Sequence, residues 1–263
     1  TPRPMASGLA GGQGVWWGGP MRFLVAHDRN PGCGLVSFCE VVTRDPFFVV
    51  GAAPRPDFRL SDLAGLRIGT VSEVPTPWMC LQDDLRRAGL DPNTLDRVID
   101  RSMAENVAAL KEGTLDGVQV FQPFVEQLVG GGAGHIWYAA ASRGPTSYTS
   151  FFTTRTMLVQ QRDILLAMTR AIYRSQKWLH GNDAETVAAA IESFFPELAS
   201  EELAAAIACY KELGLWGHDP LLPEAGFERL KAACLSGGLI SRGADYADGV
   251  DNSLAREVMM EAI

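Results

Sequence analysis

Short strand-like runs alternate with amphipathic helical stretches between residues 47 and 153, and this alternation constrains the fold more than any other feature of the sequence. The runs are rich in β-branched and aromatic residues and are bounded by glycine and proline, as strands usually are. The predicted strands are residues 21–26, 47–51, 67–71, 116–121, 135–140 and 148–153, and the predicted helices are residues 77–88, 104–111 and 124–129. This pattern predicts an α/β fold with mostly parallel sheets.

The sequence changes character after residue 157, where apolar residues recur at helical spacing. The additional predicted helices are residues 164–179, 184–195, 200–213 and 224–235. Pro196, Gly214 and the pair Gly237–Gly238 separate them, as helix-ending residues do. The sequence therefore predicts a helical C-terminal region.

The 263 residues suffice for one large domain or two lobes, and the charge balance narrows the class of protein. Asp and Glu (31) outnumber Lys and Arg (23), giving a formal net charge of −8. Proteins that bind nucleic acid or anionic membranes usually carry a basic face, so both classes are disfavoured. No run of about 20 apolar residues occurs, so no membrane-spanning helix is expected. The glycine-rich start does not resemble a signal peptide, and because Thr1 is not a natural start, we expect a leader or longer segment upstream.

Signatures of common catalytic sites are missing from the sequence. It contains no GxSxG, HExxH, Walker A or GxGxxG pattern and no CxxC pair, and its four histidines are not spaced as metal ligands. The sequence therefore predicts no catalytic residue, no metal site and no cofactor. Two alternatives stay open for the five cysteines: a disulfide between Cys33 and Cys39, and a catalytic pair of Cys33 with His27.

The loop at residues 72–76 joins a predicted strand to a predicted helix and is the first candidate for a ligand site. Thr76 is expected to cap the helix and Pro77 to occupy its first position, where a missing N–H costs nothing. The free N–H groups and the dipole of a helix start favour an anion or a ligand oxygen, and Ser72, Glu73 and Thr76 add polar side chains. The alternative is structural, with Thr76 capping its own helix and Glu73 complementing the dipole.

Two glutamines mark a second candidate region. Gln119 lies near the carboxyl end of the predicted strand 116–121, and Gln122 directly follows it. Open α/β sheets bind ligands beyond the carboxyl ends of their strands. A buried amide needs hydrogen-bond partners, which either a polar cleft or the protein interior supplies, and both alternatives stay open. Tyr148 is a candidate stacking surface for a ligand ring, although most large aromatic side chains serve packing.

Four segments resemble a known family through their order and spacing. They are residues 58–69 (FRLSDLAGLRIG), residues 88–92 (AGLDP), residues 110–117 (LKEGTLDG) and the pair Gln122-Pro123. Together they resemble the substrate-binding proteins of ABC importers, in particular the branch for nitrate, sulfonates, taurine and thiamine pyrimidine precursors. The resemblance covers roughly residues 21–195.

The resemblance implies a two-lobed type II periplasmic-binding-protein fold, with residues 1–66 and 148–263 in lobe 1 and residues 67–147 in lobe 2. It implies capture of a small organic solute by closure of the lobes, followed by docking on a membrane ABC permease. A monomeric protein outside the cytoplasm is expected. The implied ligand-binding residues are Ser72, Glu73, Thr76, Gln119, Gln122, Tyr148, Asp28 and Asn30. Members usually begin with a strand, a helix and a second strand, so about sixty residues are expected to be missing or replaced before residue 21.

Two other functions stay open on this scaffold, because a fold does not fix a function. One is an enzyme similar to pyrimidine synthases or desulfinases, which needs an activated Cys, His or Lys in the cleft. The other is a module that senses a metabolite and signals to a partner. Glu73 and the aromatic residues favour an amine-bearing or heteroaromatic solute over a bare anion such as nitrate.

Overall fold

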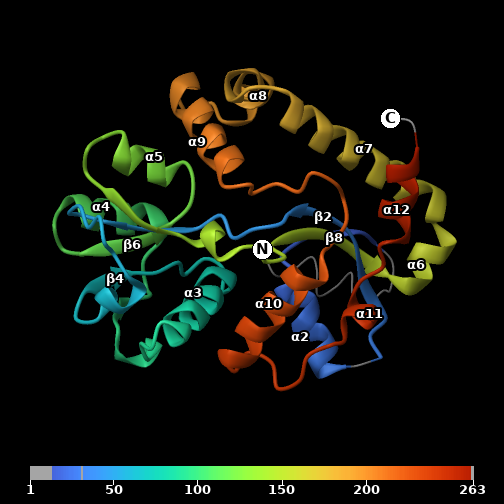
Figure 1. The fold of residues 1–263 in the computed structure, drawn as a ribbon, viewed down its shortest axis with the longest axis horizontal. Coiled ribbons are helices and arrows are strands. Elements are labelled where there is room, and N and C mark those ends of the chain that lie inside the picture. The colour runs from blue at the N-terminus through green and yellow to red at the C-terminus, as the bar shows by residue number, and fades with distance from the viewer. Residues whose placement is uncertain (1–13, 31, 262–263) are drawn as a thin grey trace. The chain divides into compact units, whose positions relative to one another are not determined.

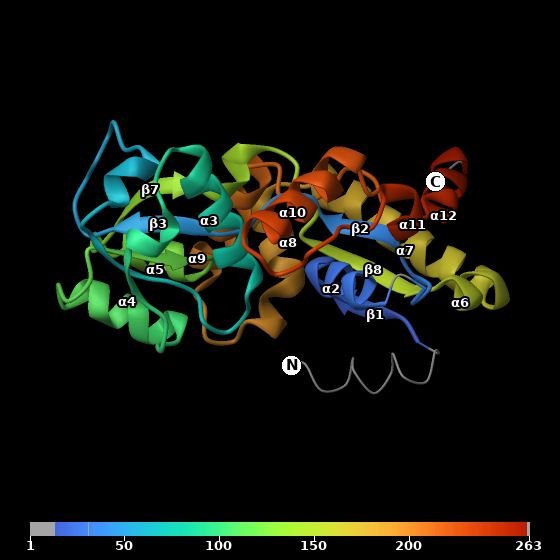
Figure 2. The same cartoon turned by 90° about the horizontal axis from the view of Figure 1, so that it is seen from below.

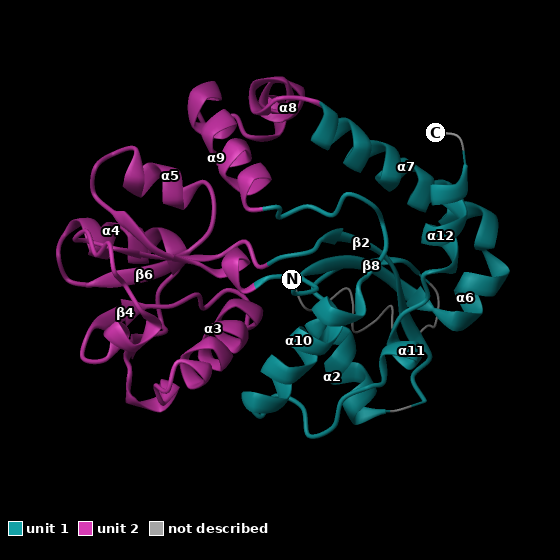
Figure 3. Cartoon of the chain, viewed as in Figure 1, with its two compact units in different colours: residues 1–44, 144–181, 214–263 teal, residues 45–143, 182–213 magenta. Residues whose placement is uncertain are grey.

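The computed structural model describes residues 14–30 and 32–261, and the chain divides into two compact units (Figures 1 and 3). Unit 1 contains residues 1–44, 144–181 and 214–263, and unit 2 contains residues 45–143 and 182–213. The sequence prediction assigns residues 45–66 and 182–213 to lobe 1, whereas the structure includes both segments in unit 2. The reason is tertiary, because residues 48–51 form an inner strand of the unit 2 sheet. Residues 1–13, most of the glycine-rich start, lie outside the described residues.

Unit 2 is built on a five-stranded mixed sheet. In order across the sheet, its strands are β5 (Asp96–Val98), β4 (Arg67–Gly69), β6 (Gly117–Val120), β3 (Phe48–Gly51) and β7 (His135–Ala139). β4 runs parallel to β5 and β6, whereas β3 runs antiparallel to β6 and β7. The expectation of a mostly parallel sheet is therefore wrong for β3, which no helical crossover joins to either neighbour.

The helices of unit 2 follow the predicted pattern closely. They are α3 (Thr76–Arg87), α4 (Met103–Lys111), α5 (Phe124–Val129), α8 (Ala184–Ile191) and α9 (Ser200–Glu212). Leu81 and Leu85 of α3 belong to one buried cluster with Val49, Ile68 and Trp137 of the sheet. Full burial of such side chains contributes about 1.5–3 kcal/mol each. This apolar contact fixes α3 on its sheet.

Unit 1 has a three-stranded antiparallel sheet within the described residues. β8 (Thr149–Thr154) lies between β1 (Trp16–Gly18) and β2 (Leu35–Val42) (Figure 2). The helices of this unit are α2 (Met21–Arg29), α6 (Arg155–Gln160), α7 (Arg162–Gly181), α10 (Glu224–Ser236), α11 (Tyr246–Gly249) and α12 (Ser253–Met260). Val36 and Phe38 of β2 pack against α6, α7 and α12 through Leu158, Leu165 and Leu254. The predicted helical C-terminal region is confirmed.

The N-terminal part of unit 1 differs from the sequence prediction. Residues 21–26, predicted as a strand, form the first part of helix α2. Met21, Leu24 and His27 are buried at a spacing of three residues, which is the helical period, and a short apolar run does not distinguish the two structures. β2 was not predicted at all, although its first six residues are buried without interruption.

Glu40 is a carboxyl group buried in the interior of unit 1. Its side chain on β2 is 1% exposed, and its Oε1 atom has no hydrogen-bond partner among the described residues. Burial raises the pKa of Glu40 from an ordinary value of 4.5 to about 8; the nearby hydroxyls of Ser147 and Thr43 partly offset this, and the charge of Asp219 adds to it. The folded protein therefore holds Glu40 as a neutral acid at neutral pH.

We expect Glu40→Gln to stabilise the protein at pH 8 and to have little effect at pH 4. A carboxyl group whose pKa is raised by folding contributes most below its unfolded pKa, and that contribution is lost as the pH rises through the folded pKa. The native protein should thus lose stability between about pH 4.5 and pH 8, on the order of 4–5 kcal/mol from this group, and the variant should not. Urea unfolding at several pH values measures this difference. Parallel stability profiles of the two proteins would contradict it.

Candidate functional site

The first turn of helix α3 is the element around which the predicted site is built. α3 follows β4 through residues 70–75 and begins at Thr76. Pro75, not Thr76, holds the cap position, and no side chain caps this end of the helix. The expected role of Thr76 as the cap is therefore wrong by one residue. Proline offers no capping oxygen, Pro77 has no N–H of its own, and the N–H of Met79 donates to the carbonyl oxygen of Pro75. The free donors of this turn are therefore the N–H groups of Thr76 and Trp78, which have no side-chain acceptor among the described residues.

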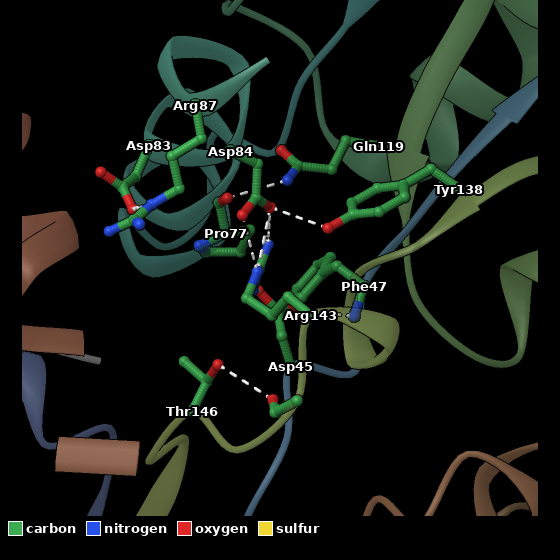
Figure 4. Close-up of polar contacts among 11 residues, drawn as sticks. Asp45, Phe47, Pro77, Asp83, Asp84, Arg87, Gln119, Tyr138, Arg143 and Thr146 are labelled. Atoms are coloured by element: carbon green, nitrogen blue, oxygen red, sulfur yellow. Dashed lines mark hydrogen bonds and ion pairs between the residues drawn. The ribbon is translucent and has the colours of Figure 1, made fainter. Parts of the chain in front are cut away.

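Gln119 connects the sheet of unit 2 to this first turn. Its side chain on β6 is 2% exposed, and its Nε2 atom donates a hydrogen bond to the carbonyl oxygen of Pro77 at 2.9 Å (Figure 4). This bond fixes the orientation of the amide, so the other atom, Oε1, is an acceptor. Oε1 is buried and has no partner among the described residues. Gln119 thus combines a structural bond with an unused acceptor.

Ser72 and Glu73 lie in the loop before α3, but their side chains bind the start of α4. The Ser72 hydroxyl donates to the carbonyl oxygen of Arg101 at 2.7 Å. Glu73 Oε1 accepts a hydrogen bond from the N–H of Met103 at 2.7 Å. Accepting an N–H is what a carboxylate does at a helix start, and the bond from Ser72 holds the chain directly before that start. Together the two contacts tie the loop to a second helix.

Gln122 serves the end of β6 and the start of α5. Its Nε2 atom donates to Glu126 Oε1 at 2.9 Å, and its Oε1 atom accepts from the N–H of Glu126 at 3.2 Å. The backbone N–H of Gln122 donates to the hydroxyl of Tyr210, which in turn donates to the carbonyl oxygen of Pro46 at 3.1 Å. The amide is satisfied inside unit 2, which is the structural alternative raised for it.

Asp28, Asn30 and Tyr148 belong to unit 1. Asp28 is near the end of helix α2, not at the end of a strand, and its Oδ1 atom accepts hydrogen bonds from the backbone N–H groups of Ser241 and Arg242. These contacts lower the pKa of Asp28, the Arg242 N–H most. Asn30 Oδ1 accepts from the N–H of Gly32. Tyr148 is buried just before β8, and its N–H donates to Val42.

A buried ionic network beside α3 was not predicted from the sequence. Arg143, whose side chain is 6% exposed, donates from Nη1 to Asp45 at 2.6 Å and from Nε and Nη2 to Asp84 of α3 (Figure 4). Tyr138 donates its hydroxyl hydrogen to Asp84 at 3.0 Å. Burial by itself lowers the pKa of Arg143, but the two carboxylates raise it well above its usual range. The guanidinium therefore stays charged and compensates both acids.

The cysteines and His27 are the remaining candidates for catalysis or disulfide formation. All five cysteines are free thiols, so Cys33 and Cys39 are not bridged. The ring of His27 is 2.8 Å from the carbonyl oxygen of Leu35. Burial raises the pKa of Cys39 and of Cys234 to about 12, so both thiols are protonated at neutral pH.

Among the described residues, no group of three or more acidic, histidine or cysteine side chains is placed to hold a metal. No helix of this part of the chain is long and apolar enough to cross a membrane.

Comparison with known sequences decides the family. The sequence profile described as the NMT1-like family matches residues 5–193, which is more than half of the chain. The chain belongs to the NMT1-like family. This NMT1-like protein is 24% identical over 261 residues to YtlA of Bacillus subtilis strain 168, named as a binding protein. That match covers 98% of this chain and 78% of YtlA.

Solved structures share the fold of this NMT1-like protein. The periplasmic aliphatic sulphonate binding protein SsuA of Escherichia coli matches with a TM-score of 0.73 at 16% identity, over 95% of this chain and 79% of SsuA. The desulfurization enzyme DSZB matches with a TM-score of 0.62 at 14% identity, over 93% of this chain and 84% of DSZB. Binding proteins and an enzyme thus share one fold, so the expected mixed α/β, periplasmic-binding-protein-like architecture is confirmed while the activity is a separate question.

We expect Arg143→Ala to destabilise this NMT1-like protein by about 3–5 kcal/mol, because it leaves Asp45 and Asp84 buried without a counter-charge. Arg87→Ala is the matched control, since it removes an arginine that pairs with Asp83 of the same helix but is 57% exposed. The control should cost less than about 1 kcal/mol. Urea unfolding at neutral pH measures both. Equal losses for the two variants would contradict the assigned role of Arg143.

Proposed function

We propose that this protein is the solute-binding component of an ABC importer, which captures a small organic solute and delivers it to a membrane permease. The observation that carries the proposal is the uncapped first turn of α3, with the unused acceptor of the buried Gln119 held beside it. Backbone donors and a side-chain acceptor next to each other are what a binding site for a polar solute needs. Membership of the NMT1-like family and the fold shared with SsuA support the same reading.

Thr76 and Gln119 are the residues that we propose contact the solute directly. Ser72, Glu73 and Gln122 would act through the helices and loops that they hold, since their side chains already bind Arg101, Met103 and Glu126. In unit 1, Tyr148 is a proposed contact, and Asp28 and Asn30 would have supporting roles in the end of α2. We propose that the protein works as a monomer outside the cytoplasm.

The proposed ligand is an organic solute that carries an acceptor oxygen or nitrogen together with an N–H donor. The N–H groups at the helix start supply donors for the solute's acceptor atom, and Gln119 Oε1 supplies an acceptor for its N–H group. Glu73 does not support an amine-bearing solute, because its carboxylate already accepts a hydrogen bond from the start of α4. A bare anion such as nitrate would leave Gln119 Oε1 buried without a partner, which costs about 1–3 kcal/mol.

A binding role, not catalysis, is the function that these residues support. Burial holds the thiols of Cys39 and Cys234 in the protonated form, and the ring of His27, the candidate base for Cys33, lies against the carbonyl oxygen of Leu35. Nucleophilic catalysis needs a thiolate or a base within reach of the nucleophile. The shared fold with DSZB keeps an enzyme as the alternative, which turnover of a bound solute would reveal.

The test is calorimetric titration with taurine, an alkanesulfonate, an aminopyrimidine and nitrate, together with native mass spectrometry of the freshly purified protein. We expect an organic solute with an N–H group to bind with a Kd of about 10 μM or tighter and nitrate not to bind. A protein that retains no solute and binds none of the four would contradict the proposal.

We expect Gln119→Leu to weaken binding of that solute by about tenfold or more, because it removes the acceptor and leaves the volume filled. Gln82→Leu is the matched control, since it removes a second buried glutamine of unit 2, one whose bonds run to Met79 and Arg86 within α3. Its affinity should stay within about twofold of the native value. Circular dichroism melting checks that both variants are folded. Equal affinity losses would remove Gln119 from the site.

A further inference from the structure

The segment that contains α8 and α9 has an unusual charge pattern. Residues 184–210 include no Lys, Arg or His. The same stretch contains the glutamates Glu185, Glu192, Glu197, Glu201 and Glu202. None of these five carboxylates forms an ion pair with a basic side chain among the described residues. This part of unit 2 therefore carries negative charge that no basic side chain pairs within the described residues, although Glu185, Glu201 and Glu202 lie in first helical turns, where the helix dipole favours them.

A hollow between α8 and α9 lies within this acidic segment. It has a volume of about 270 Å³. Small residues, Ala188, Ala189 and Ala204, line it together with acidic residues of both helices. These acidic residues are Glu185, Glu192 and Glu201, all three exposed to solvent. The hollow thus joins an apolar lining to an acidic rim.

Two phenylalanines are exposed in the segment that connects α8 and α9, close in sequence to Glu192. Phe194 is 78% exposed and Phe195 is 41% exposed. Phe194 belongs to the same short turn as Glu192, which is on the rim. A large aromatic side chain left in water is a candidate anchor for a partner, because its burial would contribute about 1.5–3 kcal/mol.

We propose that this α8–α9 surface, defined by Glu185, Glu192, Glu201, the alanine lining and Phe194, docks a basic amphipathic helix of a partner protein. Charge complementarity selects the partner, because lysine or arginine side chains pair with the rim carboxylates. The alanine-lined hollow accepts the aliphatic stem of such a side chain while its charged end stays at the rim. An apolar residue on the same helix face then covers Phe194.

The charge of the rim separates this partner from a membrane surface. Carboxylates repel anionic lipid headgroups. Insertion of the exposed phenylalanines into an uncharged bilayer would bring the charged glutamates to the bilayer surface, which is unfavourable. The docking surface belongs wholly to unit 2 and uses none of the residues proposed to bind the solute. Its test is therefore independent of the proposed transport function.

The probe is a labelled, helix-forming peptide of about 18 residues made of leucine and lysine, with a glutamate-for-lysine peptide as its counterpart. We expect fluorescence anisotropy to detect binding of the lysine peptide, weakened by about tenfold when salt rises from about 20 mM to about 300 mM. The glutamate peptide should not bind. Hydrogen exchange should slow in residues 184–205 when the lysine peptide is added.

The decisive variants neutralise the rim and remove the anchor. Glu185→Gln, Glu192→Gln and Glu201→Gln together should weaken binding by about tenfold or more, and Phe194→Ser by about threefold or more at both salt concentrations. The matched control neutralises three exposed carboxylates elsewhere in unit 2, Asp57→Asn, Asp100→Asn and Glu112→Gln, and should change the affinity by less than about twofold.

Three outcomes would overturn the proposal. The first is an equal loss in the rim variant and the control variant, which would mean that the peptide responds to net charge alone. The second is slowed exchange outside residues 184–205 only. The third is association of the protein with phosphatidylcholine vesicles that depends on Phe194, in place of peptide binding. All of the substituted residues are exposed, so each variant is expected to fold, and its thermal melting checks this.

Discussion

The pairing of one buried guanidinium with two buried carboxylates is the interaction on which unit 2 depends. Arg143 binds Asp45, which is 98 positions away in the sequence, and Asp84 on helix α3. Residues 45 and 143 are the first and last residues of the longer segment of unit 2. The Arg143 side chain therefore joins the two ends of this segment. Removing Arg143 would leave the carboxylates of Asp45 and Asp84 buried without a counter-charge.

The same network positions the element that we propose binds the solute. α3 is held near its C-terminal end by Asp84 and at its first turn by the bond from Gln119 to Pro77. The apolar contacts of Leu81, between these two points, and of Leu85, directly after Asp84, hold the same helix on its sheet. A binding element fixed in this way loses little further freedom when a ligand arrives, so more of the contact energy appears as affinity.

Burial of polar groups has different consequences in the two units. In unit 2 the buried charges are paired, so Arg143 stays ionised. In unit 1 Glu40 forms no ion pair within the described part of the chain, and burial raises its pKa until the neutral form is retained at neutral pH. The glutamates of the α8–α9 surface are exposed to solvent, where a partner can reach them. Environment, and not residue type, decides which of these acids carries a charge.

Local patterns in the sequence determined most of the elements of unit 2 and the helices that follow residue 157, because helix starts, glycine ends and apolar periodicity act over a few neighbouring residues. They also placed the loop before Pro77 at the start of a helix and Gln119 near the carboxyl end of a strand. Local patterns gave the wrong element at α2, because a short apolar run fits both the helical and the strand period. They also gave the wrong direction for β3, because no neighbouring residue specifies whether a strand runs parallel or antiparallel. Only the tertiary structure decided that Glu73 binds the start of α4, that Gln119 bonds to Pro77, and that Arg143 joins Asp45 and Asp84. Those contacts link residues 30 to 98 positions apart, and the packing of the sheet and its helices, which no local pattern encodes, brings them together.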